Sequence, residues 1–193
     1  MKAVLITLGI IGGLLLLVGA CTMGSYNGMV SADNEIDRTL GNVQSAYQQR
    51  LDTLPKFAQT AKLSTQFQVE LQERYVESRN AVQEAASTGD PNQLEQTANS
   101  EFAALRSFLT VQVEAVPQAD TSQLTELNAQ IESVERVIKH ERDAYNTAVK
   151  AKNDKVKHFP GNIVAGQFGF EPSTSFAASE EAQESPDLDL GLD

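Results

Sequence analysis

The sequence predicts an all-α protein, with one N-terminal transmembrane helix followed by an antiparallel, up-down-up-down bundle of four long helices. Three observations favour this fold class. Residues 3–23 carry no charged side chain. Four later stretches repeat apolar residues every three or four positions, the spacing of one helix face, and no stretch alternates as a strand does. One folded domain is expected, because 193 residues with no Trp, 8 Phe and 4 Tyr suit a single slender core.

The uncharged run is the strongest local signal, and we expect residues 1–25 to anchor the chain. As a helix, its 21 residues would extend about 31 Å, enough to cross a hydrocarbon core. Three interpretations stay open: a retained single-pass anchor, a cleaved secretory signal, and a lipoprotein signal in which Cys21, the only cysteine, receives a lipid. The run is longer than the apolar core of a cleaved signal, which favours the retained anchor.

Charges on either side of the run predict its orientation. Lys2 and the amino terminus precede it, whereas Asp33 and Glu35 are the first charged residues after it. Because positive charge tends to stay in the cytoplasm, we expect the bundle outside the cytoplasm. Gly9 and Gly13 form a GxxxG spacing, which lets two anchors approach closely but is also common in single membrane helices.

Residues 26–159 are expected to form the bundle. Its first helix should end near Leu54, because Pro55 disfavours helical geometry in the residue before it and suits the first turn of a second helix. Asp90 and Pro91 predict the next turn, as N-cap and first helical residue. Pro117 should close the third helix. The apolar stripe of the last helix comprises Leu124, Leu127, Ile131, Val134, Ile138, Tyr145, Val149, Val156 and Phe159.

Two polar residues, Glu141 and Lys152, interrupt this last stripe. A stripe on so long a helix needs partners of similar length, which favours the bundle. The alternative architecture is a parallel coiled-coil oligomer. The short turn before Pro91 argues against that alternative within one chain.

Two segments are expected after the bundle. Residues 160–176 should be ordered, because the stretch 159–176 holds four of the 8 Phe and such apolar side chains are too many to leave in water. They would pack on the bundle, on a neighbouring subunit or on a membrane surface. Residues 177–193 carry six acidic and no basic side chains, which predicts a disordered acidic tail.

The sequence contains no convincing pattern for chemistry. His140 and His158 are the only histidines, and neither has a second metal ligand at a suitable spacing. There is no GxSxG motif and no P-loop. The net charge of -11 argues against a nucleic-acid partner. We expect no enzyme activity, no catalytic or metal-binding residue, no cofactor and no small-molecule substrate.

Three arginines have acidic residues that could pair with them near the bundle ends. Two interpretations stay open: exposed pairs worth about 0–1 kcal/mol, or partly buried pairs that fix the helix register. The arginines are Arg50, Arg79 and Arg142, and the acids are Asp52, Glu77 and Glu135. Tyr145 and Asn146 are expected to form hydrogen bonds in helix packing.

Several motifs together resemble the LemA family. They are YNGMV at 26–30, RLDTLP at 50–55, ESR at 77–79, EAVP at 114–117, RDAYNTAV at 142–149, and FPGNIVA at 159–165 with FGF at 168–170. The resemblance implies a bacterial, membrane-anchored, antiparallel helical bundle. Its expected structural residues here are Tyr26, Asn27, Arg50, Asp52, Pro55, Arg79, Arg142, Tyr145, Asn146, Phe159, Pro160 and Asn162.

The expected function is therefore that of a structural or scaffold protein in the bacterial inner membrane, with the lipid bilayer as one partner and copies of itself as the other. Ile163, Val164, Phe168 and Phe170 are the expected assembly contacts. The alternative is an envelope adaptor that presents the bundle or the acidic tail to a protease, a sensor or another membrane protein.

Overall fold

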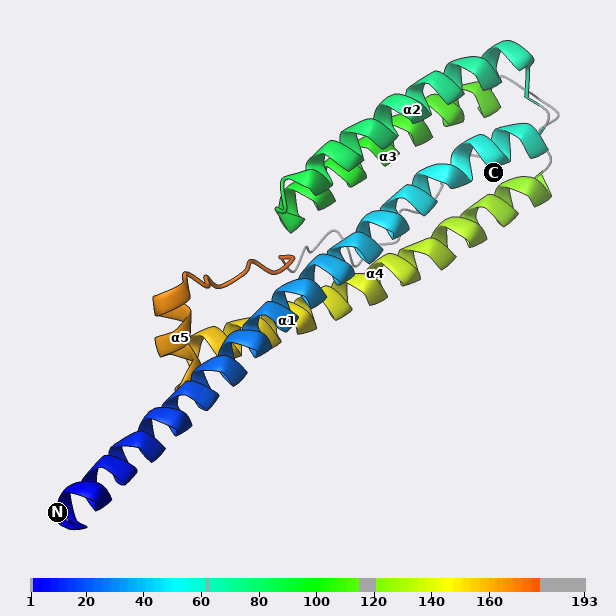
Figure 1. Ribbon diagram of the computed structural model, residues 1–193. Helices are drawn as coiled ribbons and strands as arrows, with labels where there is room; N and C mark the ends of the chain where they lie inside the picture. Colours follow the sequence, from blue (N-terminus) through cyan, green and yellow to red (C-terminus); the bar gives the residue numbers. More distant parts are fainter. Residues whose placement is uncertain (1, 62, 115–120, 178–193) are drawn as a thin grey trace. The chain divides into compact units, whose positions relative to one another are not determined.

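The computed structural model describes residues 2–61, 63–114 and 121–177. Within them it has no strand, which confirms the all-α expectation. The five helices are α1 (Lys2–Thr60), α2 (Thr65–Ser87), α3 (Pro91–Glu114), α4 (Thr121–Lys157) and α5 (Gly161–Phe168) (Figure 1). The predicted stop at Pro117 and all but the first residue of the acidic tail lie outside the described residues.

The chain divides into two compact units, and α1 and α4 each contribute to both. The N-terminal unit comprises Met1–Arg38 and Asn146–Thr174, and the central unit comprises Thr39–Tyr145 and Ser175–Asp193, each over its described residues. In the central unit, α2 and α3 lie side by side (Figure 1). The rings of Phe67 and Phe108 stack between them with centroids 5.0 Å apart.

The predicted apolar stripes supply buried side chains on all four long helices. On α4, every residue of the stripe is buried except Phe159, which is 79% exposed because α4 has already ended at Lys157. Other buried apolar residues of the central unit include Val43, Tyr47, Leu51, Leu54 and Phe57 on α1, Phe67, Leu71 and Val82 on α2, and Leu94, Phe102, Leu105 and Leu109 on α3.

The predicted helix end at Leu54 is wrong. α1 passes through Pro55 and ends at Thr60. Proline removes one backbone hydrogen bond, but Leu54 and Phe57 on either side of it are 0% and 7% exposed, so their burial favours continued helix. The corner comes later, at Ser64, whose side chain accepts a hydrogen bond from the Phe67 backbone N–H and caps α2.

The predicted turn between α2 and α3 is confirmed. α3 begins at Pro91, and Asp90 Oδ1 accepts a hydrogen bond from the Asn92 backbone N–H at 2.9 Å. Gly89 has a φ of 73°, a left-handed conformation that glycine adopts at little cost. The cap and the glycine together account for a sharp reversal after Ser87.

In the N-terminal unit, α5 packs through one face. Val164 and Ala165 join Met29 of α1 and Val156 of α4 in a small apolar core, with Phe170 partly buried against it. A Cβ at Gly161 would collide with the backbone carbonyl oxygen of Lys155, so glycine is required where the chain turns out of α4.

The other face of α5 is less covered than the sequence predicted. Val164 and Ala165 form the side of α5 that faces α1 and α4. Ile163, roughly opposite Gly161, Val164 and Ala165 on the helix, is 63% exposed, whereas Phe168 belongs to the packed face but lies at its end and is still 54% exposed. Burial of the Phe-rich segment is therefore one-sided.

Candidate functional site

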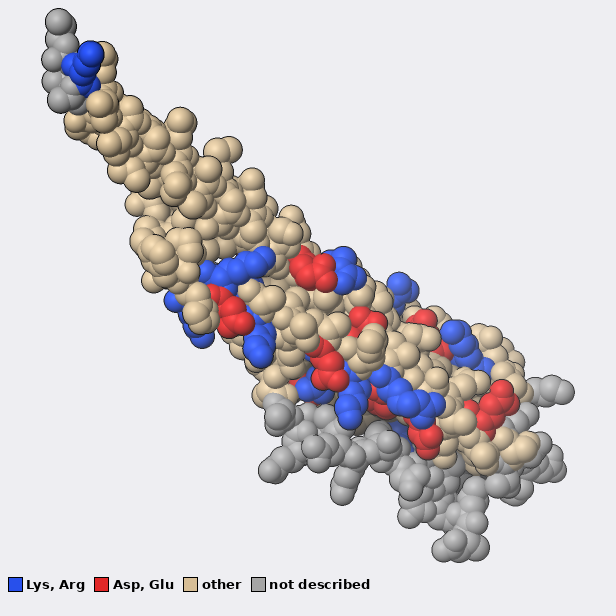
Figure 2. All heavy atoms as spheres, turned by 90° about the horizontal axis from the view of Figure 1, so that it is seen from below, with Lys and Arg blue, Asp and Glu red and all other residues tan. Residues whose placement is uncertain are grey.

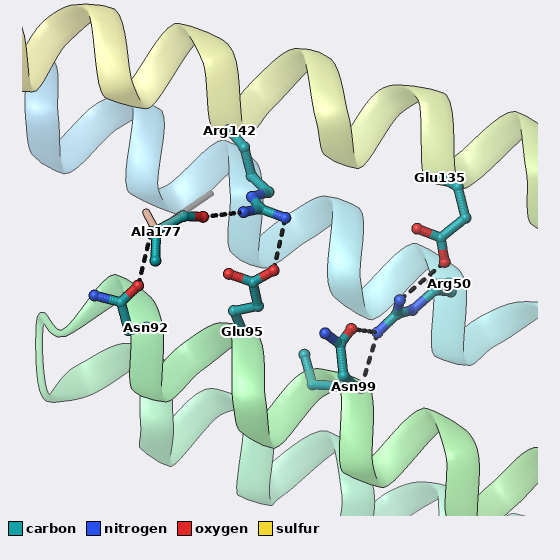
Figure 3. A network of polar contacts seen from close by, with 8 residues as sticks. Arg50, Asn92, Glu95, Asn99, Glu135, Arg142 and Ala177 are labelled. Carbon is teal, nitrogen blue, oxygen red and sulfur yellow. Dashed lines mark hydrogen bonds and ion pairs between the residues drawn. The ribbon is translucent and has the colours of Figure 1, made fainter. Parts of the chain in front are cut away.

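Arg50 on α1 is the centre of a polar network in the central unit (Figure 3). Its Nη1 donates to Glu135 Oε1 on α4 at 2.9 Å. Its Nη2 donates to the Ala98 carbonyl oxygen and to Asn99 Oδ1 on α3, both at 2.9 Å. The guanidinium carbon also lies 4.6 Å from the centre of the Phe102 ring. Arg50 thus links α1 with both α3 and α4.

Burial makes this pair structurally important. Arg50 is 4% exposed, and a buried cation is strongly disfavoured unless an anion and hydrogen bonds compensate for its lost hydration. Among the described residues, Arg50 Nε is a buried polar atom without a hydrogen bond, so Glu135 and the α3 oxygens compensate for the charge through the two Nη atoms. Such geometry fits one helix register and disfavours others.

Arg142 on α4 forms a second buried pair in the central unit. Its Nη1 lies 2.6 Å from Glu95 Oε1 on α3, and both side chains are at most 14% exposed. Its Nη2 donates to the Ala177 carbonyl oxygen at 3.0 Å, while the Ala177 N–H donates to Asn92 Oδ1 at 2.9 Å (Figure 3). The guanidinium carbon lies 5.1 Å from the centre of the Phe176 ring. Arg142 therefore holds the chain after α5 against α3 and α4.

Tyrosines contribute a third set of contacts in the central unit. The Tyr75 hydroxyl on α2 donates to Asp52 Oδ1 on α1 at 2.6 Å. Burial, and then this hydrogen bond, raise the pKa of Tyr75. Burial also raises the pKa of Tyr47, with the nearby charge of Glu95 as the next cause. Both hydroxyls therefore stay protonated, and Tyr75 acts as a donor, at neutral pH.

Lys152 is the polar centre of the N-terminal unit. It is 8% exposed, and its Nζ lies 2.6 Å from Asp33 Oδ1 on α1. The same Nζ donates to Ser173 Oγ at 2.9 Å. Asn153 exchanges two hydrogen bonds with the Ser173 backbone, through Nδ2 to the carbonyl oxygen and from the N–H to Oδ1. The polar interruption at Lys152 thus joins α1, α4 and the segment after α5.

Close to the apolar run, aromatic rings join α1 to the segment around α5. The Tyr26 ring lies 5.0 Å from Phe168 and 5.5 Å from Phe170, centroid to centroid, in edge-on contacts. Lys155 Nζ donates to the Gly28 carbonyl oxygen at 2.9 Å. Such edge-on aromatic pairs are favourable beyond their buried area. α5 is therefore attached to α1 a few residues beyond the apolar run.

In the described part of the chain, α1 is the one helix that is long and apolar enough to cross a membrane, and its apolar stretch lies at its start. Figure 2 shows this stretch almost without charge. Cys21 lies near its end and is exposed. At Gly9 and Gly13, an added Cβ would meet nothing within 4 Å.

The family-motif residues differ in exposure. Arg50, Tyr145 and Val164 are buried, and Asp52, Pro55, Arg142, Asn146 and Phe170 are half-buried. The exposed ones are Tyr26, Asn27, Arg79, Phe159, Pro160, Asn162, Ile163 and Phe168. Among the three arginines, Arg50 and Arg142 thus have the partly buried pairs, whereas Arg79 lies at the surface of α2.

Sequence reasoning overlooked several partners. The sequence did not predict Glu95, Asn99 and Asp33 as partners, although Glu95 lies beside the apolar residues Leu94 and Ala98 and so flanks a core-facing stripe. A carboxylate at such a position is a signal for a buried pair, because it is seldom buried unless it is paired. The position of Asn99 next to Arg50 depends on how α1 packs against α3.

The part of the chain that the structure describes contains no group of three or more His, Cys, Asp or Glu side chains that could hold a metal ion. His140 and His158 are both exposed, and His158 Nδ1 lies 2.7 Å from the carbonyl oxygen of Asp154 near the end of α4. The expected absence of a metal site stays a prediction.

The fold and its contacts define an all-helical protein with one candidate membrane anchor. The model of the LemA family matches residues 39–190, and the chain belongs to that family. The match begins after the apolar run and covers α2 to α5 in full. No curated protein and no solved structure matched the chain.

Proposed function

We propose that this LemA-family chain is a non-enzymatic scaffold protein of the bacterial inner membrane. The apolar part of α1 is its single-pass anchor. The rest of α1 forms, with α2, α3 and α4, an antiparallel four-helix bundle on the extracytoplasmic side. The protein acts by assembling with copies of itself, so its expected partners are lipid and further LemA chains.

The observation that carries this proposal is the continuity of α1. One helix of 59 residues contains the apolar run and, toward its C-terminus, the side chains of Leu54 and Phe57, which are buried in the core of the central unit. A helix of that length extends about 88 Å. The same helix can therefore cross a bilayer with its first part and contribute buried side chains to the central unit with its last part.

Polar contacts support the bundle arrangement within the central unit. Arg50 joins α1 to α3 and α4, and Tyr75 joins α2 to α1. Ser78 on α2 donates to Glu101 Oε2 on α3 at 2.7 Å, and Asn42 on α1 donates to Glu141 Oε2 on α4 at 3.0 Å. Each of the four helices thus has a specific bond to at least one neighbour.

The use of the buried charges supports a structural role. Arg50, Arg142 and Lys152 each face a carboxylate on another helix. Groups used in this way fix helix positions, as a polar residue in a coiled-coil core fixes register.

Assembly is tested on the full chain in membranes. Cys21 is the only cysteine, so oxidative crosslinking reports solely on Cys21–Cys21 contacts between copies. We expect a crosslinked dimer that Cys21→Ser removes, and oligomers of the uncrosslinked protein by mass photometry in nanodiscs. A strictly monomeric protein in both experiments would refute assembly. Recovery of a different envelope protein in a pull-down would then support the adaptor alternative.

The anchor and its orientation are tested separately. Intact mass should equal the full chain; loss of residues 1–20 with added acyl mass on Cys21 would replace the retained helix by a lipoprotein. Of two reporters fused after Asp193, the one that works only outside the cytoplasm should be active and the one that works only in the cytoplasm should be inactive. Activity of a cytoplasm-only reporter would reverse the orientation.

A further inference from the structure

The surface around α5 combines strong apolar exposure with the absence of charge. Phe159 is 79% exposed, Ile163 is 63% exposed and Phe168 is 54% exposed. From Phe159 to Phe170 no residue carries a charge. Three large apolar side chains left this open within ten residues are more than the single exposures that are normal on a protein surface.

The position of α5 along α1 indicates what covers this surface. Met23 is the last residue of the apolar run, and Tyr26 follows three residues later, which is about 4.5 Å farther along a helix; the chain then stays uncharged as far as Ala32. Side chains on a helix lean toward its N-terminus, so the Tyr26 ring lies closer still to the run. Phe168 contacts that ring and is thereby held at the same level.

That level is where a bilayer changes from hydrocarbon to headgroups. The interfacial layer is about 5–7 Å thick on each side, and aromatic rings are enriched in it. Tyr26, Phe168 and Phe170 are the aromatic cluster at this level. An apolar surface placed there meets lipid before it meets another protein.

The charges next to this surface fit anionic lipid. α4 ends with Lys155 and Lys157 in its last turn, and Lys155 is bound to the Gly28 carbonyl oxygen of α1. Asp154 and Glu171 are the exposed acidic residues nearest in sequence, and Lys150 adds a further cation. Lys152 is already paired with Asp33. Lys150, Lys155 and Lys157 against Asp154 and Glu171 leave a surplus of one positive charge, which is compatible with a negatively charged membrane surface.

We propose that α5, with Phe159, is a second membrane contact: a short interfacial helix that inserts Phe159 and Ile163 among the lipid headgroups beside the anchor. Its packed face, formed by Val164 and Ala165, attaches it to α1 and α4. Partial insertion of large apolar side chains is the usual basis of such binding. The inference rests on the anchor of the proposed function and is independent of homo-oligomeric assembly.

The absence of Trp from the chain gives a direct test. Phe159→Trp and Ile163→Trp each create a single fluorophore in the full chain, which is reconstituted into vesicles of phosphatidylcholine and phosphatidylglycerol with or without brominated acyl chains. Leu15→Trp, in the middle of the run, is the positive control. Ala151→Trp is the negative control, because it is exposed on α4 next to Lys152, which pairs with Asp33, ten residues beyond Met23.

Brominated lipid should quench the emission of Phe159→Trp, Ile163→Trp and Leu15→Trp, while Ala151→Trp keeps its emission. Quenching of Leu15→Trp alone would overturn the second contact while leaving the anchor intact. If Leu15→Trp is also unquenched, the anchor itself is wrong. Ile163→Trp could instead give a blue-shifted emission that brominated lipid does not quench. If that blue shift is lost when the protein is diluted in lipid, the surface contacts a second copy of the chain.

Discussion

Lys152 Nζ lies 2.6 Å from Asp33 Oδ1, and this contact joins two residues 119 positions apart in the sequence. Lys152 occupies a core-facing position of α4 and is 8% exposed, whereas the Asp33 side chain is 38% exposed. The lysine therefore carries most of the desolvation and depends on its partners. Asp33 is also the first acidic residue after the anchor, so the pair fixes α4 to α1 shortly after α1 leaves the uncharged run.

The first prediction concerns this pair. Asp33→Asn should lower the free energy of unfolding of the N-terminal unit by about 1–3 kcal/mol, because a buried ammonium loses its anion. Lys152→Met should cost less, since it removes the charge and keeps the apolar stem. The measurement is a double-mutant cycle from urea unfolding in detergent. Strictly additive effects of the two changes would show that the residues do not interact.

The second prediction concerns Arg50. Arg50→Ala should destabilise the chain by about 3–5 kcal/mol, because Glu135 is left without its cation and the α3 oxygens lose their donor. The matched control is Arg136→Ala, one position beyond Glu135, whose 3.8 Å pair with Glu132 is exposed. That control should change stability by less than about 0.5 kcal/mol. Equal effects would contradict a special role for the buried pair.

The third prediction compares two glycines of α5. Gly161→Ala should loosen α5, because the new Cβ collides with the Lys155 carbonyl oxygen. Gly166→Ala meets nothing within 4 Å and should stabilise the helix by up to about 1 kcal/mol. Hydrogen exchange of the Gly169 and Phe170 amides, which both donate to the Ala165 carbonyl oxygen, reports the difference. Faster exchange in both variants would be evidence against the packing described for Gly161.

The fourth prediction concerns alkaline pH. Burial raises the pKa of Tyr47 in the folded chain, and the unfolded side chain titrates near 10. A raised folded pKa gives stability that is fully present below about pH 10 and is lost as pH rises above it. Tyr47→Phe should therefore flatten the fall in stability above that pH, while lysine titration is common to both proteins. Parallel stability curves for the two proteins would disprove the effect.

Some of the fold follows directly from the sequence. The burial of the α4 stripe could be predicted because the spacing of apolar residues on one helix face depends only on local helix geometry. Asp90 and Pro91 predicted the start of α3 because capping involves neighbouring residues. Pro55 misled the prediction, since whether a helix tolerates proline depends on burial of Leu54 and Phe57 by other helices. The N-cap of α2 is Ser64, nine residues after Pro55.

The polar network was less predictable than the helices. Arg50 and Glu135 are 85 residues apart, and Arg50 and Asn99 are 49 apart. Their pairing depends on the rotation of each helix about its axis, which the apolar stripe defines only to within about a hundred degrees of arc. Residues beside a stripe, such as Glu95, can therefore face a partner or water. Only the packed structure decides between them.

α1 is continuous from the apolar run to Met29, which packs against α5. The rotation of the anchor about its own axis therefore determines the direction in which α5 lies. A helix turns by about 100° per residue. The side of α1 on which Gly9 and Gly13 lie therefore stands at a fixed angle, around the helix axis, to the side on which Tyr26 and Met29 contact α5 and the residues after it. One inserted residue near Gly24 would swing that direction by more than a quarter of a circle, whereas seven would nearly restore it. Chains that meet through their anchors would therefore hold their α5 helices at a defined angle around the shared axis.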